Sequence, residues 1–392
     1  MADLFAVVAP GLAAYTAQEL FALGLLPAPD AAGVEPGGVT FSGDRTAVYR
    51  ANLHLRTANR LLVRLGQFRA VGFEELRKFA GRLAWERYLA PGQPIALRVT
   101  CHKSRLYHSD AVAQRVAAAV GDRLGVAPPV QKFDEESDEQ HDKQLPQIVL
   151  VRLLHDQCTI SIDSSGALLH RRGYRLATAK APLRETLAAG MVLAAGWSPQ
   201  AAAPLLDPFC GAGTIAIEAA MLALGIAPGR ERRFAFMDWP DFDAALWQKL
   251  LAAADAQQQQ QAAMAGRLQI QASDRDAGAI VSAQANAARA GVADAIAFTT
   301  RPVSAIEPPA TPGWVVTNPP YGVRVDAGGD LRNLYAQFGK VLRSRCPGWR
   351  VALLCNDRRL LGQTGLALDM SLAMVNGGIK VMLARGTVGV RG

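Results

Sequence analysis

The segment at residues 204–224 constrains the fold of this chain more than any other. A short apolar strand ends in Asp207, and a Gly-x-Gly turn follows it directly. A helix-forming run then begins at Thr214. Glycines in such a turn let the backbone approach a ligand closely, as in nucleotide-binding turns. From Arg184 onward strand and helix patterns alternate, which predicts an α/β domain with a parallel, doubly wound sheet covered on both faces.

A second strand followed by acids supports a nucleoside site. Residues 268–274 read as a strand that ends in Asp274, with Asp276 close behind. An acid at the end of the second strand of such a unit suits the two hydroxyls of a ribose. A pyrophosphate-bearing cofactor stays open, but Asp207 beside the turn would repel phosphates and suits a cationic ligand better. The turn also has Ala216 where the dinucleotide fingerprint has its third glycine.

Asn318-Pro319-Pro320-Tyr321, at the end of the apolar run 313–316, predicts a pocket for a planar amino group. The Asn318 side-chain carbonyl and the Pro319 backbone carbonyl can both accept hydrogen bonds from one NH2 group. Tyr321 offers a flat face on which a ring can stack. The two prolines hold the turn rigid, so the acceptors are fixed before a substrate arrives. The alternative interpretation is a proline-rich turn after a buried strand.

These motifs together resemble a known group of enzymes. Residues 207–214 look like the first cofactor motif of class I S-adenosylmethionine methyltransferases, and residues 318–321 look like the catalytic motif of the branch that methylates exocyclic or amide nitrogens. Residues 181–189 resemble the segment that precedes the first motif in bacterial 23S rRNA (guanine-N2) methyltransferases. Residues 101–110, followed by a helical run, resemble the signature of the THUMP RNA-binding domain. The resemblance covers nearly the whole chain.

The resemblance implies S-adenosyl-L-methionine as the cofactor and guanine N2 of structured RNA, 23S rRNA in particular, as the methyl acceptor. It implies catalytic roles for Asn318, Pro319, Pro320 and Tyr321. It implies cofactor contacts by Arg184, Glu185, Thr186, Asp207, Cys210, Gly211, Gly213, Thr214, Asp274 and Asp276. In one respect the chain departs from the group: residues 298–304, after the third strand, contain no acid to contact the adenine region, which leaves the adenine contacts unassigned.

The candidate RNA-binding residues lie in two basic segments. The first follows the predicted strand 95–100, and the second links the two halves of the chain at residues 169–180. Arginines with a tyrosine suit RNA phosphates and bases, while the alternative is a solvated linker. The predicted contacts are Lys103, Ser104, Arg105, Arg171, Arg172, Arg175 and Lys180.

The predicted organisation has four parts. They are an N-terminal ferredoxin-like part at 1–43, a THUMP domain at 44–165, a basic linker at 166–183 and a Rossmann-like class I methyltransferase domain at 184–392. The predicted helices in the first two parts are at 13–23, 47–59, 74–79 and 110–124, and the strands are at 4–8, 38–41, 95–100, 148–154 and 158–163. A helical insertion is predicted at 228–266, and its run of glutamines at 257–261 is predicted to carry no chemistry. Arg230, Arg232 and Arg233 in the insertion are open to RNA contact, with a solvated turn as the favoured interpretation.

Composition narrows the class of protein further. The net charge of +8 is compatible with RNA binding, and the acidic run at 134–142 is predicted to be a solvated loop. Five scattered cysteines and six histidines show no metal-ligand spacing, so no metal is expected. No apolar run approaches the roughly 20 residues of a membrane span, and the N-terminus has no signal pattern. We therefore expect a cytoplasmic protein with no membrane partner.

Several alternatives stay open at this stage. The nearest is a tRNA guanine-N2 methyltransferase, since THUMP-bearing relatives act on tRNA as well. A DNA adenine-N6 methyltransferase shares the Asn-Pro-Pro-Tyr motif but would not need the THUMP-like half. A non-catalytic RNA-binding assembly factor is disfavoured by the intact motifs, and a nicotinamide-dependent oxidoreductase by Asp207. Because the chain ends soon after one methyltransferase unit, the second methyltransferase domain of some relatives is expected to be absent.

Overall fold

The computed structural model describes residues 1–28, 33–132, 146–175, 183–199, 203–322 and 331–389. The acidic run and Lys180 thus lie outside the described residues. The chain divides into two compact units. The first comprises Met1–Val8, Ala17–Leu169 and Arg232–Leu250. The second comprises Ala9–Thr16, His170–Glu231 and Leu251–Gly392.

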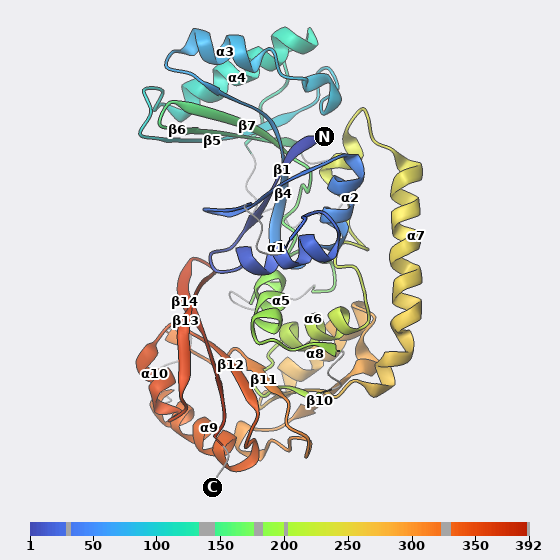
Figure 1. Ribbon diagram of the computed structural model, residues 1–392, viewed down its shortest axis with the longest axis vertical. Helices are drawn as coiled ribbons and strands as arrows, with labels where there is room; N and C mark the ends of the chain where they lie inside the picture. Colours follow the sequence, from blue (N-terminus) through green and yellow to red (C-terminus); the bar gives the residue numbers. More distant parts are fainter. Residues whose placement is uncertain (29–32, 133–145, 176–182, 200–202, 323–330, 390–392) are drawn as a thin grey trace. The chain divides into compact units, whose positions relative to one another are not determined.

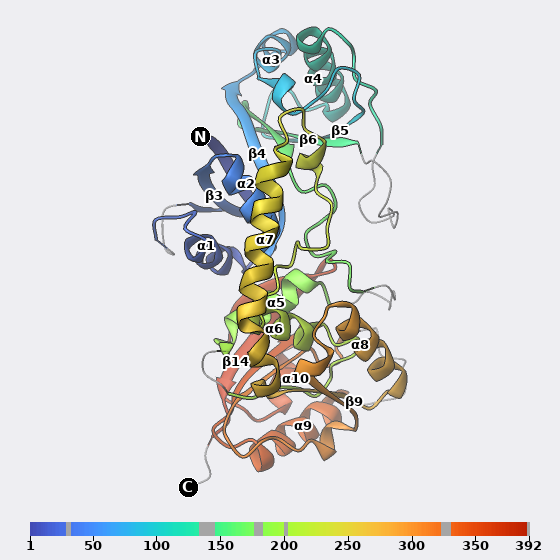
Figure 2. The same cartoon turned by 90° about the vertical axis from the view of Figure 1, so that its right-hand side faces the viewer.

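One sheet of seven strands forms the frame of the first unit (Figure 1). Its strands are β1 (Ala2–Val8), β2 (Val34–Glu35), β3 (Gly38–Gly43), β4 (Ala58–Arg69), β5 (Ile95–His102), β6 (Gln147–Leu154) and β7 (Gln157–Asp163). Their order is β2-β3-β1-β4-β7-β6-β5, and all neighbours are antiparallel except β5 and β6. The helices in this part of the chain are α1 (Ala13–Ala22), α2 (Arg45–His54), α3 (Phe73–Ala80) and α4 (Ser109–Leu124). Figure 2 shows α3 and α4 on one face of β5 and β6.

The strand β4 was not predicted, and the helix expected at 47–59 is too long. That helix ends at His54, because Leu55 takes an extended conformation with φ −66° and ψ 125°. β4 then begins at Ala58 and runs for 12 residues. Its first half, residues 58–63, is buried almost without interruption and includes the buried Arg60, so the alternation of apolar and polar residues that signals a strand is missing there.

Part of the predicted insertion completes the core of the first unit. Phe236 stacks on Tyr49 with ring centroids 4.3 Å apart. The Trp239 indole N–H donates to the side-chain oxygen of Gln147 at 2.9 Å. Aromatic rings with a satisfied polar group are typical of a packed core. The segment Arg232–Leu250 therefore has a structural role that its sequence did not reveal.

The second unit also contains a seven-stranded sheet. Its strands are β8 (Leu205–Asp207), β9 (Ile270–Asp274), β10 (Ile296–Thr300), β11 (Trp314–Thr317), β12 (Arg350–Cys355), β13 (Leu368–Asn376) and β14 (Ile379–Thr387). The order is β10-β9-β8-β11-β12-β14-β13. The first five strands are parallel, as predicted, whereas β14 is antiparallel to both of its neighbours. The final hairpin thus makes the sheet mixed rather than wholly parallel.

Helices cover the parallel strands on both faces. They are α5 (Glu185–Ala194), α6 (Thr214–Ala223), α8 (Ala277–Arg289), α9 (Leu331–Arg345) and α10 (Arg358–Gln363). A further helix, α7 (Ala244–Gln261), is divided between the two units at Leu250. In Figure 1, α5, α6 and α8 lie together on one side of the strands, and α9 and α10 lie on the other. Within the described residues no helix is both long and apolar enough to cross a membrane.

Candidate active site

The strand order places the candidate site at the carboxyl ends of β8 and β11. From β8 the chain proceeds outward to β9 and β10, and it then returns to add β11 and β12 on the opposite side of β8. Such a reversal leaves a crevice outside the carboxyl ends of the two central strands, where ligands of α/β proteins bind. The Gly-x-Gly turn follows β8, and the Asn-Pro-Pro-Tyr segment follows β11. Both predicted motifs therefore meet at this crevice.

The Gly-x-Gly turn is open on one side and closed on the other. Gly211 and Gly213 have φ of +50° and +83°, which side chains other than that of glycine rarely allow. A Cβ atom on Gly211 would meet nothing within 4 Å, whereas one on Gly213 would lie 3.0 Å from the Cβ atom of Ala283. The Asn286 side chain donates to the Ala212 carbonyl at 3.0 Å. The turn is thus fixed against α8 and leaves space at Gly211.

The residues on either side of the glycines are buried. Cys210 precedes the turn, and Thr214 is the first residue of α6. Burial raises the pKa of the Cys210 thiol, with Asp207 and Asp274 adding to the shift. The thiol is therefore neutral at ordinary pH. Both side chains are therefore uncharged beside the turn.

The predicted ribose acids lie beside the turn. The Gly211 amide donates to Oδ2 of Asp274 at 3.0 Å, and the Asp276 amide donates to Oδ1 of Asp274 at 3.1 Å. Asp276 is exposed and caps α8, since its Oδ1 accepts from the Gly278 amide at 2.8 Å. Asp274 thus ties the end of β9 to the glycine turn. Each acid has a structural role beside the predicted one.

Asp207 connects the two motifs. It is 1% exposed, and its Oδ1 accepts a hydrogen bond of 2.6 Å from the Thr317 hydroxyl at the end of β11. The Phe209 amide also donates to this oxygen, at 3.4 Å. Burial raises the pKa of Asp207 to about 7, although the Thr317 hydrogen bond acts in the opposite direction. A buried carboxyl with a pKa near neutrality marks a candidate functional group.

The Asn-Pro-Pro-Tyr segment holds one open acceptor in an anchored frame. Oδ1 of Asn318 is buried, and no donor among the described residues reaches it. The Pro320 carbonyl accepts from the Tyr335 hydroxyl at 3.2 Å. The Tyr321 hydroxyl accepts from the Asn376 side chain at 3.1 Å. Only 7% of Tyr321 is exposed, so its ring anchors the turn and does not present the open stacking face that the sequence predicted.

The candidates at the start of α5 face an arginine. Arg184 occupies the N-cap position, and Glu185 and Thr186 are buried. Glu185 forms a 2.9 Å ion pair with Arg175. Burial raises the pKa of Glu185 to about 7, and Arg175 lowers it in part. The sequence predicted that Glu185 contacts the cofactor and Arg175 contacts RNA, whereas the structure joins the two to each other.

The basic linker is more buried than predicted. The Arg172 side chain is 1% exposed and lies 2.8 Å from the carboxylate of Glu218 on α6. The Tyr174 hydroxyl donates to the same carboxylate at 3.1 Å. Arg171 is half-buried. This burial contradicts the prediction that Arg172 contacts RNA, because its charge is already paired inside the second unit.

The first basic segment is exposed, as an RNA contact requires. Lys103 and Arg105 point into solvent in the loop between β5 and α4. The loop is fixed to the β6–β7 turn, since the Asp156 amide donates to the Ser104 hydroxyl at 3.0 Å and the Arg105 amide donates to Asp156 at 2.7 Å. Tyr107 is 69% exposed beside them. An exposed aromatic ring in a basic segment was a signal for a base-stacking residue that the prediction did not use.

Three further residues complete the site and were not predicted. Thr317 and Asn376 act through contacts that depend on strand register, so no local signal identifies them. Asn356 directly follows the apolar strand β12, and its Oδ1 is buried without a donor among the described residues. A polar residue just after an apolar strand is the same signal that identified Asn318.

Comparison with known proteins places the chain among RNA-modifying enzymes. Residues 172–383 match the family described as RMKL-like, methyltransferase domain. Residues 3–62 match the RlmL ferredoxin-like domain, and residues 70–163 match the THUMP domain. These matches confirm the predicted order of a ferredoxin-like part, a THUMP domain and a methyltransferase domain.

Individual relatives extend over most of the chain. A protein of Synechocystis named as a proposed RNA methyltransferase is 36% identical over 387 residues, which are 97% of this chain and 95% of the relative. The ribosomal RNA large subunit methyltransferase K/L of Methylococcus capsulatus is 35% identical over 97% of this chain but only 50% of its own length. The chain thus spans about half the length of that relative. A crystal structure of SMU.472, described as a proposed methyltransferase complexed with SAH, has a TM-score of 0.84 at 31% identity, covering 100% of this chain and 99% of that one.

Proposed function

Because the chain belongs to the RMKL-like methyltransferase domain family, we propose that it transfers a methyl group from S-adenosyl-L-methionine to the exocyclic N2 of a guanine in structured RNA. The observation that carries this proposal is the buried, unpartnered Oδ1 of Asn318 at the crevice between β8 and β11. A buried acceptor without a donor is costly, and an amino group of a substrate would satisfy it. The THUMP domain match supports RNA as the substrate, and the K/L relatives support 23S rRNA.

The residues beside the glycine turn fit the cofactor. The space above Gly211 would admit a nucleoside close to the backbone, and Asp274 and Asp276, beside the turn, would accept from its ribose hydroxyls. Asp207, when ionised, suits a positively charged group. The cofactor, when bound, supplies a methyl group activated by a sulfonium centre. Arg184, Glu185 and Thr186 stay in this proposed site as residues that shape its edge.

Asn318 and Pro319 would act on the amino group of the substrate. The lone pair of guanine N2 is delocalised into the ring, so the nitrogen is a poor nucleophile until it is oriented. Two acceptors that hold both N–H hydrogens direct the lone pair and stabilise the positive charge that develops on the nitrogen. Alignment of this kind accounts for most of the required rate enhancement. The methylated nitrogen then loses its proton to water, so no strong general base is needed.

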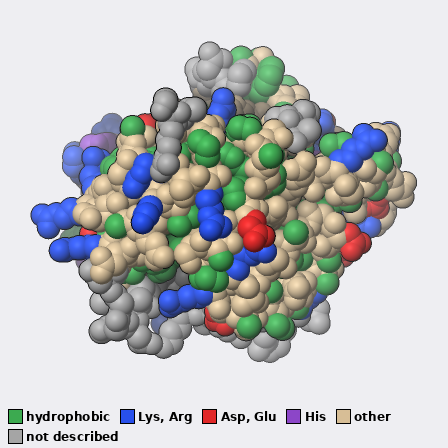
Figure 3. All heavy atoms as spheres, turned by 90° about the horizontal axis from the view of Figure 1, so that it is seen from below, with side chains coloured by type: hydrophobic (Ala, Val, Ile, Leu, Met, Phe, Trp, Pro, Cys, Tyr) green, Lys and Arg blue, Asp and Glu red, His purple; other side chains and the backbone are tan. Residues whose placement is uncertain are grey.

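Lys103, Ser104 and Arg105 form the proposed RNA contact of the THUMP part. Their loop is exposed and held to Asp156 by two hydrogen bonds, which suits phosphate binding. We retain 1–43, 44–165, 166–183 and 184–392 as the proposed domain division, with RNA binding assigned to the second part and catalysis to the last. Figure 3 shows a further face of the molecule on which Lys and Arg side chains outnumber acidic ones. Positive charge of this kind favours association with RNA.

Mapping modified nucleotides tests the proposal directly. Total RNA from cells with and without the gene would be compared by mass spectrometry of nucleosides and by primer extension. We expect one N2-methylguanosine of the large-subunit rRNA to disappear and to return when purified protein and S-adenosylmethionine are added. Replacing that guanosine with inosine, which lacks N2, should abolish methylation. Loss of a tRNA modification, or of an N6-methyladenosine, would overturn the assigned substrate.

A further inference from the structure

Two open amide oxygens stand at the ends of neighbouring strands. Asn318 directly follows β11, and Asn356 directly follows β12. The two strands are parallel and hydrogen-bonded, with Thr317 paired to Leu353. Oδ1 of each asparagine is buried and has no donor among the described residues. Asn318 thus has a counterpart of the same chemistry on the adjacent strand, which the proposed function does not use.

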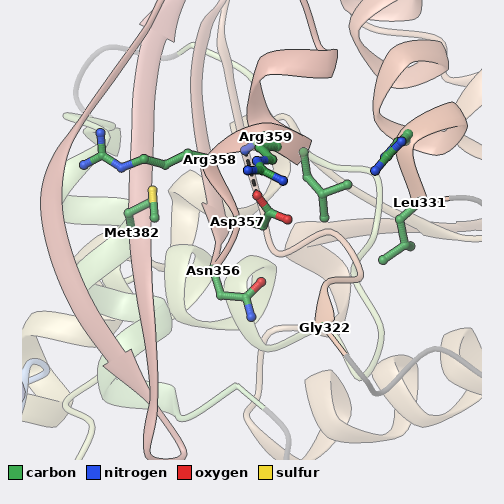
Figure 4. Close-up of a pocket in the computed structure, with 9 residues that line it drawn as sticks. Gly322, Leu331, Asn356, Asp357, Arg358, Arg359 and Met382 are labelled. Carbon is green, nitrogen blue, oxygen red and sulfur yellow. Dashed lines mark hydrogen bonds between the residues drawn. The ribbon is translucent and has the colours of Figure 1, made fainter.

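Asn356 lines a cavity of about 800 Å³. In Figure 4 its side chain extends from the end of β12 toward Gly322, the residue after Tyr321. A Cβ atom on Gly322 would lie 3.5 Å from Nδ2 of Asn356, so the asparagine lies close to the end of the Asn-Pro-Pro-Tyr segment. Met382 lines the same cavity, and its thioether sulfur is only a weak hydrogen-bond acceptor. The space is large enough for a nucleobase with its sugar.

The rim of the cavity suits a nucleotide as well. Arg358 and Arg359 both line it and are exposed. Asp357 lines the cavity too, but its carboxylate caps α10: Oδ1 of Asp357 accepts from the Arg359 amide at 2.7 Å. Guanidinium groups at the mouth of a pocket are typical partners of phosphates. The cavity therefore combines an open acceptor at its wall with positive charge at its edge.

We propose that Asn356 determines specificity for guanine by accepting a hydrogen bond from the ring N1–H of the target base. This inference rests on the proposed function. Guanine carries donors at both N1 and N2, and the open oxygens of Asn356 and Asn318 offer one acceptor for each. Adenine has an acceptor at N1, which would face the Asn356 oxygen without a hydrogen. The Asn-Pro-Pro-Tyr segment recognises an amino group of either base, and Asn356 would tell the two bases apart.

A base analogue in the RNA, combined with a substitution at Asn356, tests this assignment. Two synthetic RNA hairpins would span the nucleotide mapped above, one with guanosine and one with 2-aminopurine at that position. 2-Aminopurine keeps the 2-amino group but lacks both N1–H and O6. Because an aspartate can accept from N1–H but cannot donate to O6, the Asn356→Asp variant described below separates these two differences. For the parent enzyme we expect kcat/KM on guanosine to exceed that on 2-aminopurine. For Asn356→Ala we expect kcat/KM on guanosine to fall roughly 10- to 100-fold and that on 2-aminopurine to change little, so the ratio collapses.

Two control variants separate recognition from a general disturbance of the cavity. Asn356→Asp keeps an acceptor at the same place and should restore much of the guanosine preference. Met382→Ala enlarges the same cavity and should change both RNAs alike, leaving the ratio as in the parent. The ratio would also be taken from dissociation constants with S-adenosylhomocysteine present, so that no transfer occurs. Circular dichroism and thermal midpoints would establish that each variant is folded.

The outcomes distinguish this inference from the proposed function. If the parent methylates guanosine and the folded Asn356→Ala variant keeps the parental ratio, Asn356 does not read N1–H, and the inference is overturned while the function stands. If the parent methylates neither hairpin, or methylates inosine, the proposed function itself is overturned. A collapsed ratio with rescue by Asn356→Asp supports the assignment.

Discussion

Two basic segments of this chain were predicted to bind RNA, and the structure treats them differently. In the loop around Lys103 and Arg105 the charged groups are exposed, while the linker holds Arg172 in a buried ion pair. Both segments contain several cations and a tyrosine, so local composition does not separate them. The difference lies in the partners that the rest of the fold supplies. A positive charge is available to a ligand only where no carboxylate of the protein already pairs with it.

The partner carboxylates explain why the linker is buried. Glu218 sits on α6, whose other residues are almost all apolar and buried. A lone acid on such a helix must be paired when it is buried, and Arg172 provides the pair. The only acid that contacts the Lys103–Arg105 loop in the described residues is Asp156, which accepts from a backbone amide instead of a side chain. The loop cations therefore stay exposed.

Removing the buried arginine should produce the largest effect. We expect Arg172→Ala to lower the free energy of unfolding by about 3–5 kcal/mol, because Glu218 would be left buried without its cation. Urea denaturation measures this change. Lys103→Ala is the matched control, and as an exposed side chain it should change stability by less than about 0.5 kcal/mol. If the two variants were equally stable, the ion pair of Arg172 would contribute no more to stability than the exposed side chain of Lys103.

A double replacement sharpens the same comparison. Arg172→Met combined with Glu218→Leu removes both charges and keeps apolar volume, so it should recover part of the stability that Arg172→Ala removes, less the hydrogen bond that Tyr174 loses. RNA affinity of this folded double variant should match that of the parent. A clear fall in RNA affinity would mean that Arg172 reaches RNA after all.

Asn318→Ala should show the opposite pattern to Arg172→Ala. Its Oδ1 has no partner among the described residues, so the protein loses no internal hydrogen bond there and stability should barely change. Methyl transfer, however, should fall by a factor on the order of 100 or more, as when one preorganised hydrogen-bonding group is removed from beside a developing charge. Single-turnover rates on the mapped RNA measure this effect. Transfer as fast as in the parent would exclude Asn318 from catalysis.

Asp207→Asn should weaken cofactor binding by roughly 10- to 100-fold at pH 8, since a charge-assisted interaction is removed. The asparagine keeps an acceptor for Thr317, so RNA affinity should change far less than cofactor affinity. A cationic ligand favours the ionised carboxyl. Because the pKa of Asp207 is raised to about 7, parental affinity should therefore fall as the pH drops below 7, and the difference from the variant should shrink. Calorimetry at several pH values checks both effects.

The raised pKa of Asp207 also predicts the direction in which the stability of the fold changes with pH. The folded chain holds the Asp207 proton more tightly than the unfolded chain, so the stability from the protonated carboxyl is lost as the pH rises from about 4 to about 7. Glu185, also raised to about 7, contributes in the same direction. Stability of Asp207→Asn should decline less steeply over this range. A parallel decline would show that Asp207 does not carry the shift.

The smallest effect is expected in the exposed loop. Changing Lys103 and Arg105 together to Glu should reduce RNA affinity and flatten its dependence on salt by roughly 0.7 to 0.9 logarithmic units for each phosphate that the loop no longer neutralises. Filter binding over a salt series measures the slope. The matched control changes Lys78 and Arg82, exposed residues of the same unit, to Glu and alters the net charge equally. If both double variants give one slope, the loop makes no specific phosphate interaction.

The sequence predicted local features of this protein better than distant pairings. The glycine turn at Gly211, the open amide of Asn318 and the parallel strands all follow from short stretches of residues. Arg172 was misread because its partner lies 46 residues away on α6. The buried ring of Tyr321 depends on Asn376, which the antiparallel hairpin β13–β14 positions. Contacts of this kind depend on how helices and strands pack together, and short sequence patterns do not indicate that packing.

The Thr317–Asp207 hydrogen bond couples the cofactor side of the crevice, at the end of β8, to the substrate side, at the end of β11. A hydroxyl donates more strongly to a charged carboxylate than to a neutral carboxyl. Once a cationic ligand has drawn the proton off Asp207, the ends of β8 and β11 should therefore be held together more firmly, immediately before Asn318. Linkage between two binding sites is reciprocal. If the strengthened hydrogen bond raises the affinity for an RNA base at Asn318, the bound base should raise the affinity for the cofactor by the same factor.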